Sequence, residues 1–168
     1  MSNLEAVRLS AQAAHFLARE AALIDRRAWP QWLALFDPDA VFWMPQRDVH
    51  GNVPDSPLDA VNLLYLEHRG ALENRIARCT GGDSVANTPL PVTSHLVGSV
   101  LAEPVDGDRI VVQASFVVSA TNPVRGMQQR WGRYEHLLRR EGDDFRIVRK
   151  KVIALDEVFD GFIDVYLV

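Results

Sequence analysis

The sequence predicts an α+β fold in which N-terminal helices pack in a curved, mostly antiparallel sheet. Apolar residues recur at three- and four-residue spacing through residues 4–24, whereas apolar and polar faces alternate along residues 110–121. Two turn signals, Asp106-Gly107 and Glu141-Gly142, separate the later strands as hairpins. Helices that come first and a strand meander that follows are typical of an antiparallel sheet curled around helices.

The first helix is predicted to start at a capping box, because Ser2 stands at the cap and Glu5 follows three residues later. Small residues on its apolar stripe favour close packing against a second helix or a curved sheet, or reflect helix propensity alone. The stripe that we expect to be buried comprises Leu4, Val7, Ala11, Ala14, Leu17, Ala18, Ala21 and Ile24.

The stretch from Trp29 to Pro45 is predicted to be helix, turn and strand, and the rest of the fold is organised around it. Pro30 suits the first turn of a helix, and the Asp-Pro-Asp sequence at 37–39 should end that helix in a turn. Residues 40–44 then read as a short apolar strand. We expect four aromatic side chains of this stretch to enter one core: Trp32, Phe36, Phe42 and Trp43.

The middle of the chain is predicted to be a polar excursion over residues 46–55, followed by a helix capped by Ser56. Gly70 should break or kink this helix, whose second piece ends near Cys79, before a loop over residues 80–91. Its predicted buried face comprises Val61, Leu64, Tyr65, Leu72 and Ile76.

The second half of the chain is predicted to be strands over residues 93–103, 110–121, 127–140 and 145–155. The tail at 162–168 is apolar up to its last residue, and chain ends are usually polar and frayed. We therefore expect the tail to be buried, either as an edge strand of its own sheet or against another chain.

Composition limits the classes of function. The 168 residues, 48 % of them hydrophobic and 24 % charged, fit one domain over residues 1–168. The net charge of -4 argues against a nucleic-acid partner, and no apolar run has membrane-spanning length. The first residues lack a signal-peptide pattern, which favours the cytoplasm, and a single cysteine agrees with this location.

Few motifs for independent chemistry are found. The five histidines show no paired metal-binding spacing, and the two glycines in residues 80–84 lack the context of a phosphate loop. His95 and His136 are the histidines expected to point inward, most simply as hydrogen-bonded core residues. Because strand residues alternate between faces, we expect the basic residues crowded in the last two strands to form salt bridges within and between subunits.

Five segments together resemble a known family across nearly the whole chain. They are residues 16–21 followed by Asp25 and Trp32; residues 42–45; residues 69–75; residues 93–95; and residues 163–166. The sequence is similar to the small (beta) subunits of aromatic-ring-hydroxylating dioxygenases of the benzoate, toluate and anthranilate type. The resemblance implies an NTF2-like cone of helices wrapped by a curved sheet, in agreement with the α+β fold inferred from the residues. Leu96 to Ser99 depart from the family pattern after His95.

The resemblance also implies a partner, a catalytic large (alpha) subunit that carries a Rieske 2Fe–2S cluster and a mononuclear Fe(II). It implies an alpha3beta3 assembly, electrons delivered through a reductase, and a benzoate-like substrate. The small subunit would be structural, with no catalytic, cofactor-binding or metal-binding residues. Because a Rieske centre needs two cysteines and two histidines, Cys79 alone excludes one in this chain.

The same fold type offers an alternative, a stand-alone small-molecule-binding protein, or an isomerase or dehydratase with a pocket between helices and sheet. The resemblance to ketosteroid isomerase would place a catalytic acid directly before the proline that closes the first strand, where this chain has Met44, which cannot act as a base. The expected pocket residues are Tyr65, His95 and His136. The expected subunit-interface residues are Arg130, Arg133, Arg149, Lys151 and Tyr166.

Overall fold

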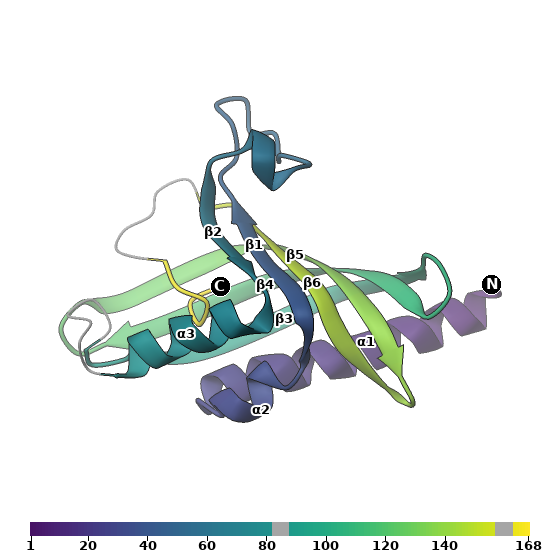
Figure 1. The fold of residues 1–168 in the computed structure, drawn as a ribbon, viewed down its shortest axis with the longest axis horizontal. Coiled ribbons are helices and arrows are strands. Elements are labelled where there is room, and N and C mark those ends of the chain that lie inside the picture. The colour runs from purple at the N-terminus through teal and green to yellow at the C-terminus, as the bar shows by residue number, and fades with distance from the viewer. Residues whose placement is uncertain (82–87, 157–162) are drawn as a thin grey trace.

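The computed structural model describes residues 1–81, 88–156 and 163–168. Figure 1 shows helices packed on a strongly twisted sheet. The elements are α1 (Asn3–Asp25), α2 (Trp29–Leu33), β1 (Phe36–Pro45), the 3₁₀ turn η1 (Pro57–Asp59), β2 (Asn62–Glu67), α3 (Arg69–Thr80), β3 (Val92–Pro104), β4 (Arg109–Asn122), β5 (Gly126–Glu141) and β6 (Asp144–Ala154).

The six strands form one sheet in the order β2-β1-β6-β5-β4-β3. All neighbouring strands are antiparallel except β1 and β6, which run parallel. Figure 1 shows α1 crossing one face of this sheet and α3 lying beside β1 and β2. The predicted α+β fold with a mostly antiparallel sheet is therefore confirmed. The two hairpin turns are confirmed as well, with Gly107 and Gly142 at positive φ.

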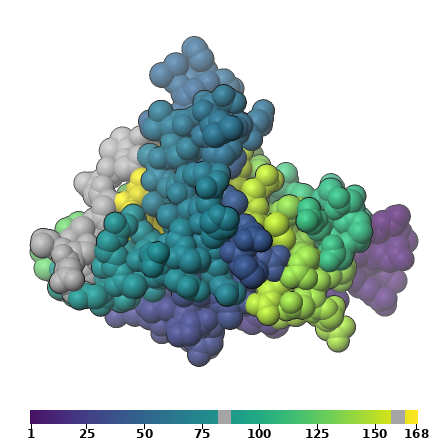
Figure 2. Space-filling model, viewed as in Figure 1, coloured from purple at the N-terminus to yellow at the C-terminus, as the bar shows by residue number. Residues whose placement is uncertain are grey.

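Helix α1 begins as predicted but turns a different face inward. Ser2 Oγ accepts from the Glu5 amide, and the Glu5 carboxylate accepts from the Ser2 amide, so the capping box is confirmed. Leu4 and Val7 are exposed, because the first turns of α1 project past the sheet, as Figures 1 and 2 show. The residues that are buried are Leu9, Ala13, Phe16, Leu17, Glu20, Ala21 and Ile24.

The predicted turn at 37–39 is wrong, since β1 already begins at Phe36 and runs through the Asp-Pro-Asp sequence. The pairing of β1 with β6 is irregular between Phe36 and Val41, which leaves Pro38 where the ladder is interrupted. A proline is tolerated at such a position because no ladder hydrogen bond is required of it. Helix α2 ends at Leu33, three residues earlier than the expected Phe36.

The predicted helix from Ser56 is also wrong beyond its first turn. Ser56 does cap the short η1 turn through the Leu58 amide, but residues 62–67 form strand β2 against β1. A short apolar run does not distinguish a helix from a strand. Residues 62–67 form a strand because they pair with β1. Gly70 lies in the first turn of α3, so it breaks no helix.

Alternation along β1 separates two of the aromatic side chains that we expected in one core. Phe42 joins Trp32 and Phe36 on the inner face of the sheet, within the main hydrophobic cluster. Trp43 points to the outer face, where it is still buried, with Nε1 donating to Asn62 Oδ1 at 2.6 Å and Lys151 Nζ 4.4 Å from its ring. The expectation of a single aromatic core is therefore corrected by strand parity.

The excursion between β1 and β2 covers the outer face of the sheet around Trp43. Lys151 Nζ donates to the carbonyl of Pro54 at 2.7 Å, and Arg47 Nη2 donates to the carbonyl of Leu155 at 3.3 Å. The rest of the excursion stands out from the body of the molecule at the top of Figure 2. The outer face around Trp43 and Lys151 is thus covered by the chain itself.

Replacement of Trp43 with alanine is expected to lower the free energy of unfolding by about 3–5 kcal/mol, because a large buried ring would leave a cavity. Urea unfolding followed by circular dichroism measures this loss. The matched control is Trp131→Ala on the same face, where the ring is 47 % exposed and the loss should stay within about 1 kcal/mol. Equal losses in the two variants would contradict the burial of Trp43.

The tail is buried within its own chain. Residues 165–168 therefore need no second chain to bury them, which was one of the two predicted alternatives. Val165, Tyr166, Leu167 and Val168 are at most 3 % exposed, yet they form no strand. The expected edge strand is therefore wrong, while burial is confirmed. Phe162, the first residue of the expected tail, lies outside the described residues, as do residues 82–87 of the predicted loop at 80–91.

Candidate functional site

A cluster of charged and polar side chains occupies the inner face of the sheet, between α1 and strands β5 and β6. Glu20 extends from the buried face of α1, and Lys150 Nζ donates to its Oε1 at 2.8 Å. Trp32 Nε1 reaches the same oxygen at 3.4 Å, and His136 Nε2 lies 3.4 Å from Oε2. Glu20 and Lys150 side chains are 3 % and 1 % exposed, so this is a fully buried ion pair.

Electrostatics fix the protonation states of this cluster. Burial alone would raise the pKa of Glu20, but the Lys150 charge and the contact with His136 outweigh it and hold that pKa far below its usual range. Burial lowers the pKa of His136, so this histidine is neutral at pH 7. Burial also raises the pKa of Tyr134, whose ring lies 4.4 Å from Lys150 Nζ. Glu20 is thus a carboxylate committed to structural partners.

A second polar group joins the end of α1 to the start of β3. His95 Nδ1 lies 2.6 Å from Asp25 Oδ1, the His95 amide donates to Asp25 Oδ2 at 3.0 Å, and Thr93 Oγ1 donates to Oδ1 at 2.8 Å. Burial opposes ionisation, but the hydrogen bonds from His95 lower the pKa of Asp25 below its usual value. An imidazole oriented by a carboxylate is a common acid–base arrangement, and here it fastens helix α1 to the sheet.

The three residues predicted to line a pocket do not come together. His136 and His95 do point inward, as expected, but they belong to the two separate groups around Glu20 and Asp25. Tyr65 pairs with Trp43 across β1 and β2, which places it on the outer face, where its hydroxyl donates to Glu67 at 2.8 Å. Strand parity therefore places Tyr65 on the opposite face of the sheet from the two histidines.

The five residues predicted to form an interface divide into two sets. Arg133 and Arg149 are exposed on the outer face. Arg130 is buried and donates to Asp156 at 2.6 Å, and Lys151 and Tyr166 are buried within this chain, so these three offer almost no surface to a partner.

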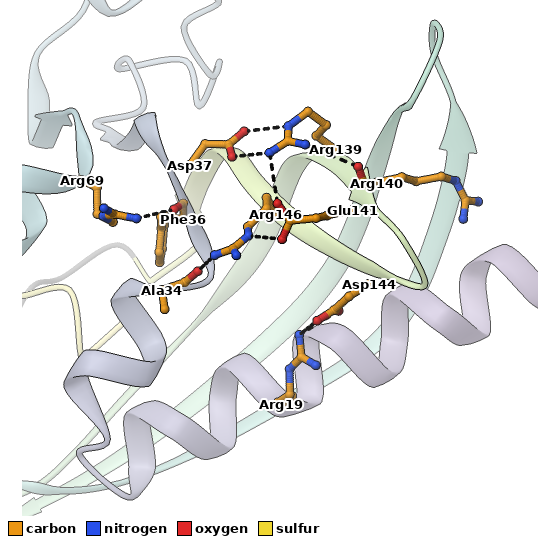
Figure 3. A network of polar contacts seen from close by, with 10 residues as sticks. All are labelled: Arg19, Ala34, Phe36, Asp37, Arg69, Arg139, Arg140, Glu141, Asp144 and Arg146. Carbon is orange, nitrogen blue, oxygen red and sulfur yellow. Dashed lines mark hydrogen bonds and ion pairs between the residues drawn. The ribbon is translucent and has the colours of Figure 1, made fainter.

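The prediction that the basic residues of the last strands form salt bridges is confirmed within the chain, and Figure 3 shows one network. Arg139 donates to both oxygens of Asp37, at 3.1 and 2.7 Å, and these bonds raise the pKa of Arg139. Arg146 donates to Glu141 at 2.6 Å and to the carbonyl of Ala34. The network ties the β5–β6 hairpin to the start of β1.

Metal-ligating side chains do not cluster in the part of the chain that the structure describes. Within residues 1–81, 88–156 and 163–168, no three His, Cys, Asp or Glu side chains gather where they could hold a metal ion. The one thiol of the sequence, Cys79, donates to Asp164, and the residues therefore do not fit a Rieske cluster. Nor does any helix of the described residues have the length and apolar character needed to cross a membrane.

A surface hollow of about 250 Å³ lies beside the excursion, away from the two inner groups. Arg47 and Asp48 line it together with Leu63 and Asp156. It has no inward histidine, and the buried charges of Glu20 and Lys150 do not reach it. The hollow and the polar interior are therefore separate features.

These observations define a class of protein: an α+β cone of the NTF2-like type, whose inward-facing charges are paired with one another. The backbone agrees closely with the beta subunit of the benzoate 1,2-dioxygenase from Burkholderia mallei, with a TM-score of 0.77 and 30 % sequence identity over 94 % of this chain and 96 % of that one.

Sequence comparison identifies the family. The family model described as "Ring hydroxylating beta subunit" matches residues 19–160. The small subunit of 2-halobenzoate 1,2-dioxygenase from Burkholderia cepacia is 34 % identical over 99 % of both chains. The small subunit of anthranilate 1,2-dioxygenase from Acinetobacter baylyi is 31 % identical over 90 % of this chain and 92 % of its own. The chain belongs to the family of ring-hydroxylating dioxygenase beta subunits.

Sequence reasoning missed the Glu20–Lys150 pair at the centre of the cone. Glu20 lies four residues after Phe16 and four before Ile24, so a helical stripe drawn through those two residues contains it. Lys150 gave no such signal, because β5 and β6 shift register between Leu137 and Leu138 and so change which β6 residues face inward.

Proposed function

We propose that this chain is the non-catalytic structural subunit of a Rieske non-haem iron dioxygenase that acts on a benzoate-like aromatic substrate. The large subunit would carry the Rieske cluster and the mononuclear Fe(II), receive electrons through a reductase, and assemble with this chain in the cytoplasm as three large and three small subunits. The relatives' names support the substrate class, since they specify 2-halobenzoate, benzoate, anthranilate and toluate.

The observation that carries the proposal is a group of exposed apolar side chains on the outer face of strands β3, β4 and β5. There Leu96 pairs with Val117, and Val117 pairs with Trp131, which places the three side chains in one row across β3, β4 and β5. They are 69 %, 37 % and 47 % exposed, respectively. Cross-strand neighbours lie about 5 Å apart, so the row is a continuous apolar strip.

Further exposed apolar side chains, Val92, Leu101 and Met127, lie on the same face of these strands. Arg133 lies two residues after Trp131 on β5, and Arg149 lies on the neighbouring strand β6. Monomeric proteins rarely expose apolar strips of this extent, whereas interface centres are enriched in Trp, Met and Arg. The large subunit is the occupant that we assign to this surface, because membership of a subunit family supplies a partner chain. The excursion limits this apolar surface on the side of β6, because it covers Lys151 on that strand.

The interior supports the same role. Two inward carboxylates are bound to basic side chains, Glu20 to Lys150 and Asp25 to His95. A general base must be free to meet a substrate proton. The Glu20 carboxylate, held by Lys150 and in contact with His136, is therefore not free to act as a base, and it stabilises the cone.

The proposal predicts that Trp131→Ala weakens co-purification with the large subunit at least tenfold without unfolding the small one, since a partly exposed Trp at an interface centre typically contributes about 2 kcal/mol or more. The yield of the large subunit per tagged small subunit measures this, with Arg133→Ala as a second variant. Leu58→Ala is the control, because Leu58 is 91 % exposed on the excursion, outside the strip.

If the yield of the large subunit is unchanged for both Trp131→Ala and Arg133→Ala, the large subunit does not bind to this face. A tagged wild-type chain that instead binds a second copy of itself through the strip would assign the face to contacts between small subunits. In that case the Trp131→Ala variant should change the mass of the isolated small subunit in solution.

A further inference from the structure

The C-terminal segment at residues 163–168 is attached to the cone in an unusual way. Its last four residues are buried as deeply as the core, yet among the described residues the segment joins no strand ladder. Two of its hydrogen bonds are local, from the Leu167 amide to the Asp164 carbonyl at 2.9 Å and from the Val165 amide to Asp164 Oδ1 at 2.8 Å. Side chains rather than backbone pairing therefore carry much of its attachment.

Asp164 is the polar anchor of this segment. Its side chain is 2 % exposed and accepts from Arg75 Nε at 3.0 Å, from Arg75 Nη2 at 3.1 Å and from Cys79 Sγ at 3.0 Å. Arg75 and Cys79 lie four residues apart on α3, so they present their donors on one face of the helix. One carboxylate thus joins the segment to two successive turns of α3.

Apolar packing supplies the rest of the attachment. The segment belongs to the same buried cluster as Leu72 and Ile76 of α3. The ring of Tyr166 lies 6.4 Å from that of Trp29 at the start of α2. The segment therefore lies between α3 and the α1–α2 corner, and its removal would leave apolar surface on both.

We propose that residues 163–168 form a strap that opens and closes as a unit, latched by Asp164, while the rest of the cone stays folded. Segments that lack ladder hydrogen bonds open at a lower free energy than the strands of a sheet. The opened strap uncovers the ring of Trp29 and the side of α3 that carries Arg75 and Cys79, and with them surface that the closed form hides. This inference goes beyond the subunit role and does not depend on the identity of the partner.

Cys79 reports the state of the latch. In the closed strap, burial and the hydrogen bond to Asp164 raise the pKa of the Cys79 thiol to about 12. Alkylating reagents attack the thiolate, so the closed form is nearly inert near neutral pH. Opening removes the cover and the carboxylate together and returns the thiol towards its ordinary pKa.

The experiment follows alkylation of Cys79 in the full chain by iodoacetamide at increasing urea concentration, beside global unfolding measured by circular dichroism. The strap predicts alkylation well below the unfolding transition, through an opening whose urea dependence is much weaker than that of global unfolding. Alkylation that tracks global unfolding at every urea concentration would overturn the strap, and this wild-type measurement suffices even if a variant fails to fold.

The variant Arg75→Gln distinguishes opening of the strap from a direct effect of the Arg75 charge on the reactivity of Cys79. Loss of Arg75 removes two hydrogen bonds from a buried carboxylate, so alkylation should become on the order of a hundredfold faster. Its positive charge lowers the pKa of Cys79, so without any opening the same variant would make Cys79 less reactive. Slower or unchanged alkylation in this variant would therefore contradict the latch.

Arg78→Gln is the matched control, since it removes the same charge from the same helix. Arg78 is exposed, and it also lowers the pKa of Cys79. The control should alkylate at the wild-type rate or slightly more slowly. A hundredfold acceleration in Arg78→Gln as well would show that the charge of α3, and not the bond to Asp164, holds the segment closed.

Discussion

Glu20→Ala is expected to lower the free energy of unfolding by about 3–5 kcal/mol, because it leaves Lys150 buried without its partner. Lys150 Nζ donates to Glu20 Oε1 at 2.8 Å, and its side chain is only 1 % exposed. Urea unfolding at pH 7 measures the loss. A double variant, Glu20→Leu with Lys150→Met, should recover most of it, because apolar residues of similar volume replace a buried pair at little cost.

If the double variant were as unstable as Glu20→Ala, the loss would come from the shape of the site and not from an unpaired charge. The pair also predicts acid sensitivity. The folded-state pKa of Glu20 is held below its ordinary value of 4.5, so its contribution is present above about pH 4.5 and is lost as the pH falls below that value.

His136 adds a second pH range in which acid lowers the stability of the folded chain. Burial lowers its folded-state pKa from the ordinary 6.5, so the unfolded chain binds a proton first and stability declines as the pH falls below about 6.5. The His136→Gln variant should no longer lose stability as the pH falls below about 6.5, but it should still lose the contribution of Glu20 below about pH 4.5. Stability that rises as the pH falls from 7 to 5 would contradict the assignment of His136, and stability that does not decline below about pH 4.5 would contradict that of Glu20.

Gly132→Ala is expected to lower the free energy of unfolding by about 3 kcal/mol, at the upper end for an overpacked site. A Cβ at this position would lie 2.1 Å from the carbonyl oxygen of Ile153 and 3.0 Å from the Phe116 ring. The ring cannot retreat easily, because it stacks on Tyr134 with centroids 4.2 Å apart. Backbone of β6 would therefore have to move away from β5.

Gly98→Ala is the control for this prediction, since Gly98 lies in strand β3 with open space where its Cβ would be. The control should change stability by less than about 0.5 kcal/mol. Thermal and urea unfolding of both variants under the same conditions measure the difference. Equal effects would show that strand propensity, and not the contact with Ile153, determines the cost at Gly132.

Local signals predicted most of the elements correctly. The Ser2–Glu5 capping box, the two hairpin glycines and the alternation along β4 each depend on a few neighbouring residues, and each is confirmed. The errors arose where distant pairing decides the outcome. Residues 62–67 are a strand because β1 is beside them, and Trp43 faces outward because successive residues of β1 alternate between the two faces of the sheet.

The polar interior was less predictable than the fold. The inward orientation of His95 and His136 followed from strand parity, but their partners Asp25 and Glu20 come from α1, and sequence spacing gives no measure of contacts across the core. The register shift between β5 and β6 determines the inward position of Lys150, and it depends on three-dimensional pairing alone. Tyr65 was misplaced because its segment was taken for a helix.

The most direct test of the subunit assignment is the composition of the complex that this chain forms. A tagged full-length chain is purified from cells that also express the genes encoded beside it, and the mass, iron content and visible spectrum of the eluate are recorded. The assignment predicts a larger, iron-containing chain in equal amount, with the absorbance of an iron–sulfur cluster. A colourless, iron-free small subunit alone in the eluate would contradict it.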